Sequence, residues 1–124
     1  MKALALDFGS ARTGVAVSDP TGTVARPLTI VERAATDAGF AKLLEVIAAE
    51  EPEVVVVGMP LTLRGEHGEQ AQETAAFVER LRAAIGVRVE TYDERFTSVL
   101  AEGDDARAAA HLLSSYLEWQ SAGR

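Results

Sequence analysis

The sequence predicts an α/β domain with a mixed five-stranded sheet and helices on both faces of that sheet. Three observations predict it. Short apolar runs separated by turn residues fill the first thirty residues, which is typical of an antiparallel meander. Two later apolar runs each follow a segment of helical periodicity, which is typical of parallel strands. With 124 residues, 48% of them hydrophobic, we expect residues 1–124 to form a single domain around one core.

The meander is the first part of the sheet that the pattern predicts. Its strands are expected over residues 2–7, 13–18 and 24–31. Gly9 and Gly14 are expected to flank a tight first turn, and the sequence Asp19-Pro20-Thr21-Gly22 is a strong signal for the second. Neighbouring strands joined by such short turns pair antiparallel.

A helix and a buried strand follow the meander. Between residues 36 and 51, apolar side chains recur at steps of three and four: Phe40, Leu43, Leu44, Ile47 and Ala48. Pro52 is expected to end this helix. The run of four valines at 54–57 is continuous rather than alternating, which indicates a strand covered on both faces.

The rest of the sequence predicts a loop over about residues 58–68 and a helix over 70–84. A strand over 87–92 and a final helix over 104–120 are expected to follow. The apolar stripe of the final helix begins at Asp105, and Asp104 lies one position off it. Asp104 is therefore assigned to the N-cap, and Asp105 is expected to point toward the sheet. The alternative is that both acids serve only the helix N-terminus.

Composition excludes several kinds of chemistry. The chain has no cysteine, so disulfides, a thiolate nucleophile and a cysteine zinc site are excluded. Its first apolar run is too short for a secretory signal or a membrane span, so a cytoplasmic protein without membrane association is expected. The net charge of −7 disfavours a broad basic surface for nucleic acid, although two divalent cations would reduce it to −3.

Acidic residues at the ends of buried elements are the strongest candidates for a site, because a buried carboxylate needs a cation or hydrogen-bond donors. Asp7 ends the first strand, where a turn-forming role is the alternative. Asp93 and Glu94 end the strand over 87–92, and alternation places them on opposite sides of it. One of the two could be a ligand while the other pairs with Arg95 or caps a helix, and the spacing does not decide between them.

Three hard oxygen ligands at one sheet edge would suit Mg²⁺ or Mn²⁺ better than Zn²⁺. Two such ions can activate a water molecule and stabilise the leaving oxygen of a phosphodiester. The pattern therefore favours a metal-dependent nuclease that needs no nucleophilic side chain.

Three motifs in order resemble the YqgF family. They are Asp-Phe-Gly-Ser-Ala-Arg-Thr-Gly-Val-Ala-Val-Ser-Asp at 7–19, Val-Gly-Met-Pro-Leu-Thr-Leu-Arg-Gly-Glu-His-Gly at 57–68, and Asp-Glu-Arg-Phe-Thr-Ser at 93–98. The resemblance extends to Ser-Tyr-Leu at 115–117. Members of the family are named for nuclease action on pre-16S ribosomal RNA and are also described as Holliday-junction-resolvase-like. The resemblance therefore implies a ribonuclease H-like fold and hydrolysis of phosphodiester bonds.

The resemblance also implies the site residues. The catalytic carboxylates, which would also hold Mg²⁺ or Mn²⁺, are Asp7, Glu94 and Asp105. Glu94 is thereby preferred to Asp93, and aligning the closing helix with that of the family places its acid at Asp105 rather than Asp104. The candidate contacts to substrate are Gly9, Arg12, Arg64 and Arg95.

One departure from the family and several alternatives stay open. Between Ser98 and Asp104 the chain has only Val-Leu-Ala-Glu-Gly, where family members usually carry a longer helix and a basic loop. The expected partner is nucleic acid, RNA before branched DNA, and a homodimer is left open. A non-catalytic scaffold and an ATP-binding turn of the actin type are the competing functions, and fold likeness alone does not decide among them.

Overall fold

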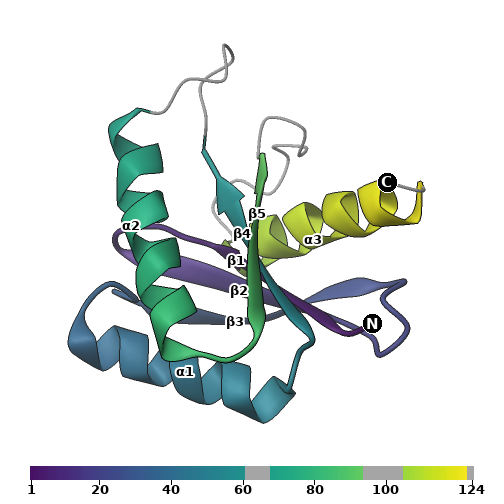
Figure 1. The fold of residues 1–124 in the computed structure, drawn as a ribbon, viewed down its shortest axis with the longest axis horizontal. Helices are drawn as coiled ribbons and strands as arrows, with labels where there is room; N and C mark the ends of the chain where they lie inside the picture. Colours follow the sequence, from purple (N-terminus) through teal and green to yellow (C-terminus); the bar gives the residue numbers. More distant parts are fainter. Residues whose placement is uncertain (61–67, 94–104, 123–124) are drawn as a thin grey trace.

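The structure is a computed structural model that describes residues 1–60, 68–93 and 105–122. In this part of the chain five strands form one sheet in the order β3-β2-β1-β4-β5, and three helices cover it (Figure 1). The strands are β1 (Ala3–Asp7), β2 (Arg12–Ser18), β3 (Ala25–Glu32), β4 (Val54–Met59) and β5 (Arg88–Asp93). The helices are α1 (Asp37–Glu50), α2 (Glu69–Ala84) and α3 (Asp105–Ser121).

Strand pairing follows the predicted mixed pattern. β1 pairs antiparallel with β2, which pairs antiparallel with β3, so the first three strands are the meander. β4 runs parallel to β1 on its other side, and β5 runs parallel to β4. The carboxyl ends of β1, β4 and β5 therefore meet at one edge of the sheet, and the predicted fold class is confirmed.

Two apolar layers separate the helices from the sheet. Leu4 and Leu6 of β1 point toward α1 and α2, where the core includes Val55 and Val57 of β4. The alternate side chains of β1 point toward α3, whose buried residues are Ala106, Ala109, Leu112, Leu113, Tyr116 and Leu117. The opposite parity of neighbouring residues thus assigns the side chains of β1 and β4 to one helix layer or the other.

The central strand β4 is buried along its whole length, as its continuous run of valines predicts. Val54 and Val56 pack in the layer below α3, and Val55 and Val57 pack in the layer of α1 and α2. Burying one valine side chain contributes roughly 1.5 kcal/mol or more, so the run contributes strongly to the core.

Helix α1 begins and ends where the local chemistry predicts. The Thr36 hydroxyl accepts a hydrogen bond from the Gly39 amide at 3.1 Å, which caps the first turn. Glu51 takes a left-handed conformation with φ of 52° at the C-cap, and Pro52 follows it. With both caps included, the helix covers the expected residues 36–51.

The second turn of the meander is also confirmed. Gly22 has φ of 75°, a conformation that favours glycine, and its amide donates to the Asp19 carbonyl oxygen at 3.0 Å. The Asp19 carboxylate accepts hydrogen bonds from the amides of Thr23 and Val24 at 2.8 and 2.9 Å. A hydrogen bond from the Thr21 hydroxyl, followed by these two, holds the pKa of Asp19 well below its usual range.

Candidate active site

Asp7 is the last residue of β1 and lies at the carboxyl edge of the sheet. Ala3 and Ala5 belong to the apolar layer below α3, so alternation directs Asp7 to the α3 side as well. The side chain is half-buried. The structure therefore places Asp7 where the sequence predicts it, at the end of a buried strand.

Gly14 determines how closely α3 approaches Asp7. It lies in β2 directly opposite Asp7 in the antiparallel register. A Cβ atom built at Gly14 would lie 1.8 Å from the backbone carbonyl oxygen of Asp105, so only glycine leaves room for the first turn of α3. The expectation that Gly14 flanks the turn was wrong, because β2 begins at Arg12 and Gly14 lies inside the strand.

Asp7 and Asp105 interact electrostatically across this contact. Burial, followed by the negative charge of Asp105, raises the pKa of Asp7 from 3.8 to about 6. The prediction that Asp105 points toward the sheet agrees with this interaction.

Arg12, the first residue of β2, contacts the carboxylate of Asp105. Its Nε donates to Oδ2 of Asp105 at 2.9 Å. The Arg12 side chain is 59% exposed and that of Asp105 is 31% exposed, so solvent reaches the pair from the sheet edge. Arg12, Asp7 and Asp105 are thus brought together from three different elements.

Gly9 permits the short connection between β1 and β2. A Cβ atom at Gly9 would lie 2.5 Å from the carbonyl oxygen of Arg12. Turn geometry therefore accounts for this glycine, and its proposed contact with substrate stays a prediction.

Asp93 is the last residue of β5, the third strand whose carboxyl end lies at this edge of the sheet. Tyr92 pairs with Gly58 and its hydroxyl lies 2.9 Å from the Ser115 hydroxyl on α3, so Tyr92 faces the α3 side. Alternation then assigns Asp93 to the opposite side of the sheet. The remaining predicted residues, Glu94, Arg95, Arg64 and Asp104, lie outside the described residues.

In residues 1–60, 68–93 and 105–122 no three acidic or histidine side chains form a group that could hold a metal ion. The structure thus brings two of the three predicted ligands together. Both are hard oxygen donors of the kind that Mg²⁺ and Mn²⁺ prefer.

The pKa of Asp7 predicts how stability depends on pH. In chelating buffer, the native state holds a proton on Asp7 up to about pH 6, whereas the unfolded chain loses it near 3.8. This contribution to stability is therefore present below pH 4 and is lost as the pH rises through 6, by at most about 3 kcal/mol. Denaturant unfolding of the wild type and Asp7→Asn from pH 3.5 to 7.5 measures it. Identical pH profiles for the two proteins would contradict the burial of this carboxylate.

The fold has solved counterparts. RuvC of Thermus thermophilus in complex with Holliday junction substrate superposes with a TM-score of 0.63 at 22% sequence identity, over 98% of this chain and 96% of that chain. At this identity the likeness shows the fold alone, which is a RuvC-like ribonuclease H fold.

Sequence comparison identifies the family. A family model described as "RuvX: Holliday junction resolvase" matches residues 1–119. The chain belongs to the RuvX family. RuvX and YqgF denote the same family, so the resemblance predicted from the three motifs is confirmed.

Curated RuvX relatives carry the name "Putative pre-16S rRNA nuclease". The relative from Chloroflexus aggregans is 44% identical over 99 residues, which are 80% of this chain and 70% of that protein. The relative from Desulforudis audaxviator is 34% identical over 139 residues, with 100% of this chain and 99% of that protein covered. This second alignment is longer than the 124 residues of the chain, so that relative carries residues that this RuvX chain lacks. Among the described residues no helix is both long and apolar enough to cross a membrane.

Proposed function

We propose that this RuvX-family chain is a divalent-metal-dependent nuclease that hydrolyses phosphodiester bonds in RNA and processes the ends of pre-16S ribosomal RNA. The observation that carries the proposal is the approach of Asp7 and Asp105 at the carboxyl edge of the sheet, with the pKa of Asp7 raised to about 6. The names of the relatives support RNA as the substrate.

The donor set fits a divalent cation. Burial and mutual repulsion make the ionised pair unfavourable, and a cation between the two carboxylates would remove that repulsion. Asp7 and Asp105 would hold Mg²⁺ or Mn²⁺ together with Glu94. When bound, the metal lowers the pKa of a water molecule and stabilises negative charge on phosphate oxygens.

The parity of β5 disfavours Asp93 as the third ligand, and Glu94 is proposed from the family resemblance. Tyr92 and Glu90 both contact α3, since the Tyr116 hydroxyl donates to Glu90 at 2.7 Å and Tyr92 contacts Ser115. Asp93 has the opposite parity, so it faces away from the side of Asp7 and Asp105. Glu94 lies outside the described residues.

The chain's own residues supply positioning and charge. Asp7 gives up its proton when it binds a cation, and the rigid end of β1 fixes its carboxylate. The exposed Arg12 guanidinium, paired with Asp105, is available to donate to a phosphate oxygen from the solvent side. A contact between the backbone of Gly9 and the phosphate is part of this proposal.

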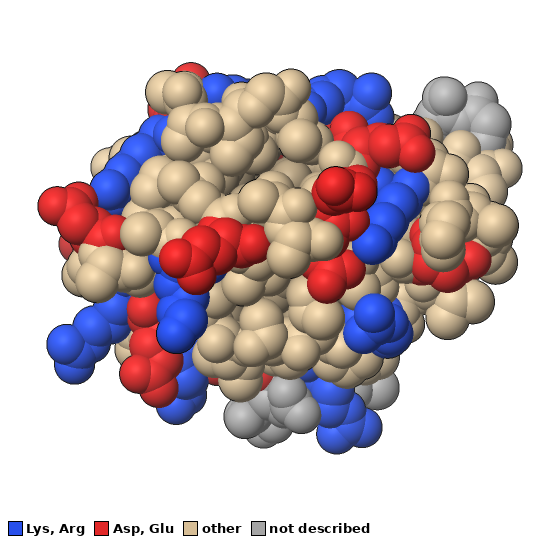
Figure 2. Space-filling model, turned by 90° about the horizontal axis from the view of Figure 1, so that it is seen from below, with Lys and Arg blue, Asp and Glu red and all other residues tan. Residues whose placement is uncertain are grey.

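Surface charge limits where the substrate could lie. On the face shown in Figure 2, which is Figure 1 seen from below, Lys and Arg side chains are interspersed with Asp and Glu. That face offers no continuous basic surface to a nucleic-acid backbone. The net charge of −7 also disfavours a broad basic surface, so the proposed contact is centred on the metal-binding edge.

Branched DNA is the second candidate substrate, because the matching family model is described as a Holliday junction resolvase. The experiment incubates purified protein with a labelled pre-16S fragment, an unrelated single-stranded RNA and a four-way DNA junction, each with Mg²⁺, Mn²⁺ or chelator. We expect metal-dependent cleavage of the ribosomal fragment. Cleavage of the junction alone would favour the resolvase, and cleavage of none of the three would overturn the proposed function.

Arg12→Ala separates a role in catalysis from a role in stability. The ion pair with Asp105 is largely exposed, so its loss is expected to change the free energy of unfolding by less than about 1 kcal/mol. Loss of a charged phosphate contact is expected to lower the cleavage rate about 10- to 100-fold. Single-turnover cleavage and denaturant unfolding measure both effects, with Arg88→Ala on β5 as the matched control, because Arg88 forms an ion pair of similar exposure with Glu90. An unchanged cleavage rate in Arg12→Ala would assign Arg12 to α3 packing alone.

A further inference from the structure

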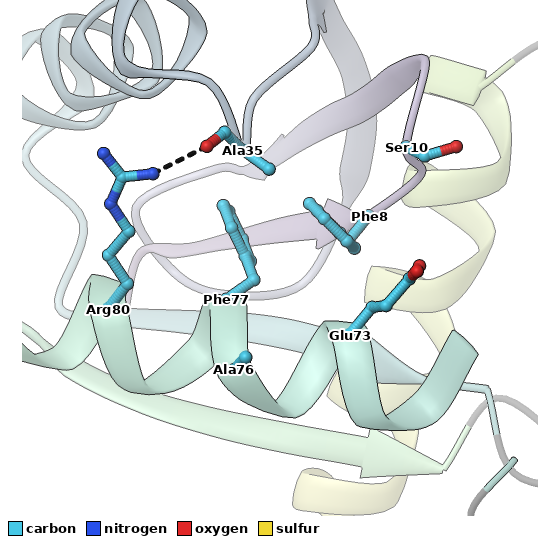
Figure 3. Close-up of a pocket in the computed structure, with 7 residues that line it drawn as sticks. All are labelled: Phe8, Ser10, Ala35, Glu73, Ala76, Phe77 and Arg80. Carbon is cyan, nitrogen blue, oxygen red and sulfur yellow. Dashed lines mark hydrogen bonds between the residues drawn. The ribbon is translucent and has the colours of Figure 1, made fainter. Parts of the chain in front are cut away.

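The aromatic residues on the two sides of the sheet edge differ in their exposure. On the side of α1 and α2, a cavity of about 440 Å³ is bordered by Phe8 and Phe77, whose rings stack with centroids 4.3 Å apart (Figure 3). Both side chains are buried, so neither ring offers a face to a planar ligand. On the α3 side lies a cluster of Tyr92, Tyr116 and Trp119. Among the described residues Trp119 is the exposed large aromatic side chain, with 48% of its surface accessible.

The two tyrosines hold the Trp119 ring in place. Its centre lies 5.9 Å from that of the Tyr92 ring and 6.0 Å from that of the Tyr116 ring. Tyr116 is buried, and its hydroxyl donates to Glu90 and accepts from Gln120, both at 2.7 Å. These contacts fix one side of the indole while nearly half of the residue stays accessible to solvent. A ring held in this way loses little freedom when a ligand binds to it.

The aromatic cluster lies in line with Asp7 across the sheet. Continuing the parallel register of β1 with β4 brings Asp7 level with Gly58, and Gly58 pairs with Tyr92. Neighbouring strands are about 4.8 Å apart, so the backbones of Asp7 and Tyr92 are separated by about 10 Å. Both side chains face α3, and Gly58 places no side chain between them. An RNA strand with a phosphate at Asp7 therefore reaches the aromatic cluster within a few nucleotides.

We propose that Trp119 is a stacking platform for an unpaired base of the RNA whose phosphate lies at Asp7; this rests on the proposed function. Unpaired bases stack on accessible aromatic rings, and every base has the π face that such stacking requires. The platform therefore holds single-stranded RNA beside the metal-binding edge without selecting one base. This position favours nucleic acid over a protein partner, because a protein of ordinary interface size bound at Trp119 would also cover that edge.

Fluorescence titration tests the platform directly, because Trp119 is the one tryptophan of the chain. The wild-type protein in chelating buffer is titrated with a short single-stranded RNA of mixed sequence and with an abasic strand of the same length. We expect the strand with bases to quench the Trp119 emission by about half and to bind about tenfold more tightly than the abasic strand. Chelation keeps metal-dependent cleavage from interfering with the titration.

Trp119→Leu and Trp119→Phe separate ring stacking from apolar contact. The anisotropy of dye-labelled RNA measures their affinities, and denaturant unfolding shows that each variant is folded. We expect Trp119→Leu to weaken the strand with bases about tenfold and to leave the abasic strand unchanged, and Trp119→Phe to stay within about threefold of the wild type. Ile30→Ala is the matched control, because it shortens another exposed apolar side chain on β3, at the opposite edge of the sheet.

Three results would overturn the platform even if the RNA cleavage assay succeeds. They are equal or undetectable binding of the two strands, an unchanged Trp119 emission, and the same RNA affinity in Trp119→Leu as in Ile30→Ala. Quenching that requires bases, together with weaker binding in Trp119→Leu, would support the platform even if the cleavage assay fails.

Discussion

Asp7→Asn is expected to lower the metal-dependent cleavage rate by at least about 10³-fold while stabilising the metal-free protein. The amide keeps the shape of the side chain but loses the negative charge that binds a cation, and such a metal ion contributes several kcal/mol to the transition state. Without metal, the same change removes a half-buried charge from the neighbourhood of Asp105. The free energy of unfolding at pH 7 is therefore expected to rise by about 1–3 kcal/mol.

Single-turnover cleavage in Mg²⁺ and denaturant unfolding in chelator measure the two effects of Asp7→Asn. Asp37→Asn is the matched control, because it removes an exposed carboxylate in the first turn of α1. That control is expected to change neither quantity by much. A stability gain with unchanged cleavage would show that Asp7 is buried at the edge without serving as a ligand.

Gly14→Ala is expected to have the largest effect on the fold. The added Cβ would meet the backbone of Asp105 and Ala106 at 1.8 to 2.9 Å, and a backbone cannot rotate away as a flexible side chain can. The first turn of α3 must then move away from β2. We expect a loss of about 3 kcal/mol of stability and, because Asp105 moves with the helix, a loss of about 100-fold in cleavage rate.

Gly86→Ala is the matched control for Gly14→Ala, because no atom lies within 4 Å of a Cβ built at Gly86. This control is expected to stay within about 0.5 kcal/mol of the wild type. Thermal and denaturant unfolding compare the variants, and cleavage is measured at a temperature where both are folded. A Gly14→Ala protein as stable and as active as Gly86→Ala would contradict the close packing of α3 on β2.

Local sequence signals predicted most of the fold. The valines of β4, the periodicity and caps of α1, and the turn at Asp19 to Gly22 each depend on residues close in the chain. The stripe beginning at Asp105 likewise predicted the inward side of α3, because helical spacing alone determines it. Predictions of this kind need no knowledge of the order of the strands.

What the sequence could not predict depends on contacts between distant segments. Gly14 resembles a turn glycine in the sequence, and only its place opposite Asp7 in β2 shows that it admits the backbone of α3. The cavity bordered by Phe8 and Phe77 depends on how α2 packs beside β1. The raised pKa of Asp7 also depends on tertiary structure, since it comes first from burial of the side chain and then from Asp105, which is distant in the chain.

Calorimetric titration with Mn²⁺ at pH 6, in buffers of different ionisation enthalpy, tests the carboxylate metal site most directly. Because the pKa of Asp7 is about 6, the wild type is expected to bind Mn²⁺ and to release about half a proton from Asp7. Asp7→Asn and Asp105→Asn are expected to bind at least about tenfold more weakly, and Asp7→Asn to lose that proton release. The same affinity and the same proton release in the wild type and Asp7→Asn would contradict a metal ion held by Asp7 and Asp105.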